Sequence, residues 1–253
     1  MKTNRYIVVF SVVILLTLSV VAGGIGAQQS FPDFLGEDST ETDFLDDPPE
    51  VVVNDPLEPM NRVFFEFNDV LYEWVVKPVS DGYSWVFPLE LRQGFGNFFD
   101  NLAMPIRLIN SLLQGNLEKT GVVMGRFLIN STVGVWGFAD VANEEFDIKP
   151  KKADFGQTLG KWGLGEGIYF CWPILGPSSV RDSVGFVADA YAHPINYLSD
   201  DRLFQVSYYM TNRLNNLSLN PDVYEDLKRY SVDPYVAARQ AYYDYRNALI
   251  DND

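Results

Sequence analysis

Apolar residues cover most of the helical circumference between Phe98 and Ile129, and this feature constrains the fold more than any other. They are Phe98, Phe99, Leu102, Met104, Ile106, Leu108, Ile109, Leu112 and Leu113, followed by Val122, Val123, Met124, Phe127, Leu128 and Ile129. A surface helix of a soluble protein shows a polar face, whereas a helix that is apolar nearly all round is buried or lies in lipid. The spacing alone leaves both alternatives open: the core of a soluble helical domain, or contact with lipid.

The rest of the chain from Asp55 onward also has helical spacing, and no alternation of apolar and polar residues predicts a dominant sheet. Helices are expected over 59–76, 89–102, 105–114, 116–130, 179–192, 202–215, 221–230 and 234–250. The breaks between them are expected at Pro78, Pro105 and Gly115. The sequence therefore predicts an all-α fold, with one helical domain over 55–253.

The N-terminus has the features of an export signal. Lys2 and Arg5 precede an apolar stretch over 6–22, and small residues follow up to Ala27. Cleavage would remove residues 1–27 as a signal peptide, while the alternative is an uncleaved anchor long enough to cross a bilayer. We expect cleavage, and export in either case.

Residues 28–54 contain eight acidic residues and no lysine or arginine. Such a composition buries too little apolar surface to order itself, so this segment is expected to be a disordered acidic linker. The whole sequence has a formal charge of −15. This charge argues against nucleic acid as a partner, and it leaves apolar contact as the means of holding a membrane.

The stretch from Ser131 to Pro177 is rich in glycine and is expected to be irregular. A segment this long inside a compact domain is usually functional, and glycine lets the backbone approach another backbone or a ligand closely. We therefore expect the moving part of the protein here, with Gly137, Gly156 and Gly160 in a mobile loop.

No catalytic or metal-binding set is recognisable. The one histidine, His193, is expected to make a structural hydrogen bond at a helix end, and the one cysteine, Cys171, to be a small buried apolar residue. The sequence has no G-x-S-x-G elbow and no HExxH pair, and the segment 163–167 lacks the lysine of a phosphate loop. The protein is therefore predicted not to be an enzyme and to need no cofactor or metal.

Arg126 and Asn130 are four residues apart, so they share one helix face. A cation among apolar residues needs a partner or a wet cavity. A lipid phosphate and a carboxylate elsewhere in the fold are the two alternatives for Arg126.

Several motifs follow one another in a fixed order: NDPLEPMNR at 54–62, Phe67-Asn68, Lys77-Pro78, NFFDNL at 97–102, NxLLQG at 110–115, RFxxNSTxG at 126–134, DFGQTLGxWG at 154–163 and LGPSxxRD at 175–182. Together they resemble the MlaA (VacJ) family over roughly 54–197. Members of that family typically carry a cysteine at the end of the signal peptide. This sequence has none there, so acylation at a lipobox is not expected.

The resemblance implies a ring of amphipathic and apolar helices around a channel, embedded in the periplasm-facing leaflet of the outer membrane. It implies association with an outer-membrane porin trimer, and transfer of phospholipid from the outer leaflet to a periplasmic lipid carrier without covalent chemistry. The lipid path is then expected to include Phe67, Asn68, Arg126, Asn130 and Gly134. The alternatives are a structural porin-associated protein and a lipid hydrolase.

Overall fold

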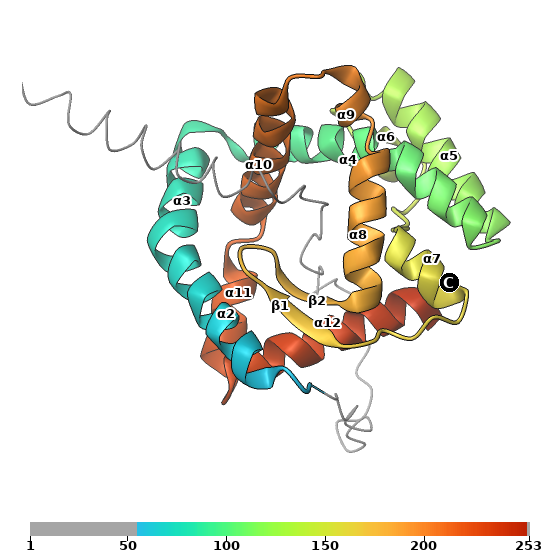
Figure 1. Cartoon of the computed structure of the whole chain (residues 1–253). Coiled ribbons are helices and arrows are strands. Elements are labelled where there is room, and N and C mark those ends of the chain that lie inside the picture. The colour runs from blue at the N-terminus through green and yellow to red at the C-terminus, as the bar shows by residue number, and fades with distance from the viewer. Residues whose placement is uncertain (1–54, 252–253) are drawn as a thin grey trace, which may run out of the picture.

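The computed structural model describes residues 55–251, which form a ring of helices with one small β-hairpin (Figure 1). The expected signal peptide over 1–27 and linker over 28–54 lie outside the described residues. The elements in chain order are α2 (Glu58–Leu71), the π-helix η1 (Tyr72–Val76), α3 (Lys77–Val86), α4 (Leu89–Leu113), α5 (Leu117–Thr132), α6 (Val141–Glu144), α7 (Phe155–Lys161), β1 (Tyr169–Trp172), β2 (Gly176–Ser179), α8 (Val180–Ala192), α9 (Ile195–Leu198), α10 (Arg202–Leu219), α11 (Asp222–Tyr230) and α12 (Pro234–Asp251). The prediction of an all-α fold is confirmed, apart from the hairpin.

Two expected helix breaks are wrong, and both involve proline. The chain stays helical through Pro78, because this residue lies in the first turn of α3, where a missing N–H leaves no hydrogen bond unmade. Pro105 lies inside α4, which continues to Leu113. An internal proline costs about 3 kcal/mol in an isolated helix, and the packing of α4 against α5 and α10 offsets this.

Two expected helix starts are confirmed by side-chain caps. Asn116 accepts a hydrogen bond from the Lys119 amide at 2.9 Å and so begins α5. Ser179 accepts one from the Asp182 amide at 3.1 Å and begins α8. Both caps satisfy amides that a helix leaves unpaired at its start.

The glycine-rich stretch over 131–177 is not irregular as expected. It contains α6, α7, β1 and part of β2, and the two strands pair antiparallel, with Tyr169 opposite Ser179 and Trp172 opposite Gly176. Short elements escape a search for periodicity, because four-residue strands and helices span only one or two repeats.

The ring is closed by contacts between its first and last helices. Arg62 in α2 donates to Asp233 beside α12 at 2.8 Å, and Arg239 in α12 donates to Asp55 at 3.1 Å. Next to this contact, Tyr169 and Cys171 of β1 pack against Tyr235 and Tyr243 of α12 in one apolar cluster. Among the described residues no helix is long and apolar enough to cross a membrane.

Candidate functional site

The helices of the ring bury polar side chains and expose apolar ones. In α5 three of the four buried residues are polar (Lys119, Arg126 and Asn130, beside Val123), while Leu117 is 78% exposed and Leu128 is 55% exposed. Figure 1 places α5 on the outer edge of the ring, so its apolar face points away from the molecule. A water-soluble helix has the opposite arrangement.

The outward face of α2 and of the following η1 carries a continuous apolar row of exposed side chains, which we call the α2 row. Its members follow one another at spacings of three and four residues: Met60, Val63, Phe67, Val70 and Trp74. The hairpin packs on the inner side of this helix (Figure 1). Phe67, one of the expected lipid-path residues, therefore lies on the outside of the ring.

Helix α8 presents a second apolar row of exposed side chains, on the face opposite α7. Val180, Val184, Val187 and Tyr191 are exposed and lie four, three and four residues apart, which places them on one face. The opposite face packs on α7, where Gly185 lies against Gly156. Because α7 is on the outer side of α8 in Figure 1, the apolar row lies on the side of α8 that is turned away from α7.

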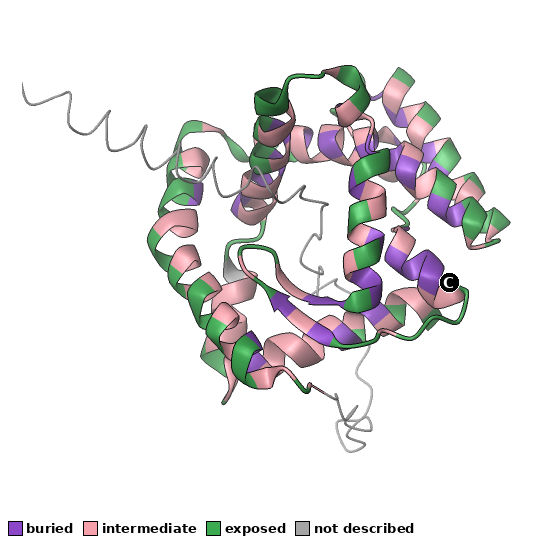
Figure 2. Ribbon diagram, in the orientation of Figure 1, coloured by how far each residue is buried: buried purple, intermediate pink, exposed green. Residues whose placement is uncertain are grey.

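Exposed aromatic side chains are frequent on the same ring. All five tryptophans of the sequence are exposed: Trp74, Trp85, Trp136, Trp162 and Trp172. Figure 2 shows exposed residues distributed along the helices right round the ring. Tryptophan favours the border between water and membrane, since its ring is apolar and its N–H is polar.

Asn68 joins α2 to the turn of the hairpin. Its side-chain amide donates to the Trp172 carbonyl at 2.8 Å, and its carbonyl accepts from the Ile174 amide at 2.5 Å. Trp172 in turn donates from its indole to Ser183 of α8 at 2.9 Å. The hairpin turn is thus fixed between α2 and the apolar row of α8, and Asn68 is the residue that holds it.

Arg126 and Asn130 are both buried against a carboxylate, one of the two alternatives that the sequence left open for Arg126. Both are 4% exposed, and both donate to the carboxylate of Asp140, Arg126 at 2.8 and 2.9 Å and Asn130 at 2.8 Å. Asn130 also accepts from the amide of Ala142 at 2.9 Å. The carboxylate alternative for Arg126 is the one that the structure contains, and the pair ties α5 to α6.

Glycines in the expected mobile loop lie in tightly packed backbone. A Cβ at Gly134 would come within 2.3 Å of the Ala139 carbonyl, and one at Gly137 within 2.3 Å of Asn101. Gly156 and Gly160 belong to α7, where a Cβ would meet Asp182 and Ile250 respectively, each at 2.6 Å. These glycines allow close packing, and mobility at these positions stays a prediction.

A buried ion network that sequence reasoning missed holds α7, α8 and α12 together. Arg246 donates to Asp154 at 2.7 Å and to Asp182 at 2.9 Å, and Arg181 also pairs with Asp182, at 3.0 Å. Loss of hydration would raise the pKa of Asp154, but the charge and hydrogen bonds of Arg246 lower it to about 2. The motifs contain Asp154, Arg181 and Asp182, whereas nothing in the sequence marks Arg246 as their partner.

The single histidine and the single cysteine of the sequence both have structural environments. His193 accepts from the Ile195 amide at 3.2 Å, which confirms its structural hydrogen bond, and burial lowers its pKa to about 4. Burial raises the pKa of the Cys171 thiol to about 12, so this residue is not a reactive thiolate. Among residues 55–251 no three His, Cys, Asp or Glu side chains cluster as metal ligands would.

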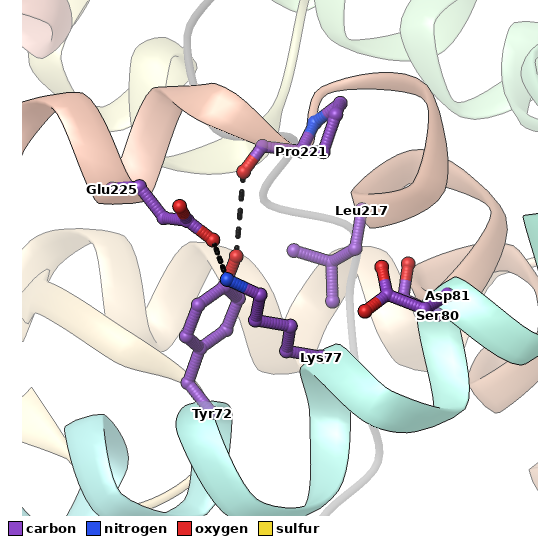
Figure 3. A pocket seen from close by; sticks show the side chains of 7 residues that line it. All are labelled: Tyr72, Lys77, Ser80, Asp81, Leu217, Pro221 and Glu225. Atoms are coloured by element: carbon purple, nitrogen blue, oxygen red, sulfur yellow. Dashed lines mark hydrogen bonds and ion pairs between the residues drawn. The ribbon is translucent and has the colours of Figure 1, made fainter.

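A small pocket of about 230 Å³ lies where α3, α10 and α11 meet (Figure 3). Lys77 and Glu225 form an ion pair across it, and the Tyr72 hydroxyl donates to the Pro221 carbonyl at 3.3 Å. Small-molecule sites usually have volumes of about 300–1,000 Å³. This pocket is smaller, and Lys77 and Glu225 already pair with each other across it.

Comparison with protein families matches residues 53–249 to the family described as MlaA lipoprotein. The chain belongs to this family. The match includes every helix and strand of the ring, from α2 to the α12 segment that closes it.

Individual relatives agree with this assignment. The intermembrane phospholipid transport system lipoprotein MlaA of Escherichia coli (strain K12) is 33% identical over 203 residues, covering 79% of each chain. The protein of the same name from Haemophilus influenzae is 32% identical over 199 residues, covering 75% of this chain and 76% of the relative. A solved structure described as "Structural basis for maintenance of bacterial outer membrane lipid asymmetry" superposes with a TM-score of 0.70 at 29% identity, over 78% of this chain and 100% of that one.

Proposed function

We propose that this protein is a non-enzymatic component of phospholipid transport that lies in the periplasm-facing leaflet of the outer membrane. It removes phospholipid that has reached the outer leaflet and delivers it to a periplasmic carrier. The observation that carries the proposal is the inverted distribution of side chains, with charged and amide groups between the elements and apolar rows on α2, α5 and α8. This arrangement suits a ring in contact with hydrocarbon.

The energy of this contact is sufficient to hold the protein. Each Leu, Val, Phe or Met side chain transferred from water into an apolar environment contributes about 1.5–3 kcal/mol. Because the five residues of the α2 row are 40–79% exposed, moving their exposed surface into hydrocarbon contributes on the order of 5 kcal/mol. Since the chain carries a formal charge of −15, electrostatic attraction to anionic lipid adds nothing.

The lipid path that we propose runs along the apolar row of α8. Acyl chains would lie against Val184 and Val187, with the hairpin turn beside them. Asn68 acts in this proposal by holding the turn, while Arg126, Asn130 and Gly134 support the outer helix α5 and do not touch lipid. The headgroup keeps its ester bonds, because no nucleophile with a basic partner lies near this row among the described residues.

The partners that we propose are a trimeric porin and a periplasmic lipid carrier, as the family resemblance implies. The relatives from Escherichia coli and Haemophilus influenzae are named lipoproteins. The single cysteine of the sequence, Cys171, lies buried in β1 and cannot carry their acyl group without unfolding. The apolar rows of the ring are our proposed means of attachment.

The test is the lipid composition of the outer leaflet in a strain that lacks this gene. Loss of the protein should raise outer-leaflet phospholipid and sensitivity to detergent, and the wild-type gene should restore both. A strain with no homologous gene and a normal outer leaflet would refute transport. Cleaved phospholipid on re-expression would favour a hydrolase, and restoration by a variant with charges in the α8 row, such as Val187→Asp, would favour a purely structural porin-associated role.

A further inference from the structure

The turn over 133–138, between α5 and α6, has a strained backbone. Val135 and Trp136 adopt φ angles of 52° and 61°, in the left-handed region that side chains with a Cβ avoid. A β-branched residue such as valine is least suited to it. Strain of this kind persists only where the surroundings impose it, and it is concentrated at functional segments.

The strained residues point their side chains away from the protein. Val133, Val135 and Trp136 are 66%, 68% and 77% exposed, and they continue the exposed face of α5 beyond Leu128. No charged residue occurs between Arg126 and Asp140, and these two residues are paired with each other. The turn is therefore an uncharged apolar projection on the outer edge of the ring.

Nearly all backbone amides of the turn bond within the protein. The amides of residues 133 and 134 both donate to the carbonyl of residue 129. The amides of residues 136, 137 and 138 donate to the carbonyls of residues 131, 130 and 135, respectively. The Trp136 and Phe138 carbonyls accept from the side chains of Asn101 and Asn97, each at 3.3 Å. A turn exposed to water needs few such bonds, whereas irregular backbone in hydrocarbon must satisfy its polar groups internally.

We infer that the 133–138 turn is a membrane-insertion element that places Val133, Val135 and Trp136 among the acyl chains of one leaflet. The inference rests on the proposed membrane location and goes beyond it, since it names the segment that enters the hydrocarbon. Strain is tolerated here because it directs two adjacent side chains to the same side of the ring. Hydrocarbon fits this surface better than a protein partner, because the turn carries no charged residue that would orient a protein interface.

Depth-dependent quenching tests the inference. A fluorescent NBD label at Trp136→Cys in the full chain is mixed with vesicles of phosphatidylethanolamine and phosphatidylglycerol that carry spin labels at different acyl depths. The matched control is Val232→Cys, an equally apolar and exposed site between α11 and α12. Cys171 is buried and stays unlabelled in the folded protein. The expected result is a blue shift and acyl-depth quenching at residue 136 only.

Asparagine variants separate insertion from folding. Asparagine accepts the left-handed conformation, so Val135→Asn and Trp136→Asn should melt at the wild-type temperature or above it. Each should weaken vesicle partition about tenfold, while Val232→Asn leaves it unchanged. The inference is overturned if both variants bind vesicles as the wild type does, or if the labels at 136 and 232 are quenched equally. It is also overturned if a photocrosslinker at residue 136 captures protein and no lipid in cells. Lipid clearance by the wild type tests the proposed function separately, so the two failures are distinguishable.

Discussion

Replacing Arg246 by methionine should destabilise the ring more than any surface change on the same helices. Arg246 is 5% exposed and lies between Asp154 and Asp182. Methionine fills a similar volume without charge, so it leaves two carboxylates near each other, with Arg181 as the remaining cation beside Asp182. Breaking a buried ion pair from one side costs about 3–5 kcal/mol.

The measurement is thermal unfolding followed by circular dichroism in detergent micelles. For a chain of this size, 3–5 kcal/mol corresponds to a fall in Tm of about 10 °C. Arg229→Met, at an exposed position of α11, is the matched control and should change the stability by less than about 0.5 kcal/mol.

The pH dependence provides an independent check of the same network. In the folded protein the pKa of Asp154 is lowered to about 2 from its usual 3.8. A lowered carboxyl pKa contributes stability above pH 4 that is lost as the pH falls toward 2. In Arg246→Met the loss of stability at low pH should vanish, because protonation removes the repulsion between the Asp154 and Asp182 carboxylates, which have lost their shared cation. A variant that melts within about 2 °C of wild type, with the same acid sensitivity, would refute a stabilising role for the network.

Three further outcomes follow from single sites. Asn68→Ala should cost about 1–2 kcal/mol locally, seen as faster amide hydrogen exchange in the hairpin while α12 exchange is unchanged. Gly137→Ala should lower the free energy of unfolding by about 1–3 kcal/mol, because the new Cβ meets Asn101 at 2.3 Å, whereas Gly82→Ala in the open helix α3 should raise it by about 0.5–1 kcal/mol. Burial raises the pKa of Asp189 to about 6, so the folded state holds its proton more tightly than the unfolded state. Stability should therefore decline by up to about 3 kcal/mol between pH 4 and 6, and Asp189→Asn should flatten that slope in denaturant titrations.

The helical architecture could be predicted from the sequence because long helices repeat their apolar spacing several times. Caps at Asn116 and Ser179 were readable for the same local reason, since donor and acceptor are three residues apart. Proline was misleading at 78, which lies in the first turn of α3, and at 105, where the packing of α4 outweighs a local preference. The hairpin was missed because four residues per strand show almost no periodicity.

The sequence predicted part of the exposed apolar surface of the ring. Apolar helices were evident, but which face of each is buried depends on partners far along the chain. Arg126 illustrates this: its spacing to Asn130 was readable, while its pairing with Asp140 depends on the turn between α5 and α6. Phe67 and Asn68 are adjacent in sequence, yet one lies on the outer surface and the other holds the hairpin.

Closure of the ring by its two ends has a consequence for how the protein is made. Arg62 and Asp233 are 171 residues apart, and Asp55 and Arg239 are 184 apart. Contacts this distant in sequence form slowly, because a long loop must close before they contribute any stability. Synthesis from the N-terminus delivers α12 last, so the earlier helices wait as an open arc in which the polar groups of Asp55 and Arg62 have no partner on α12. The interval before α12 arrives is therefore the period of greatest exposure to aggregation and proteolysis, and a chain cut before residue 233 stays an open arc throughout its lifetime.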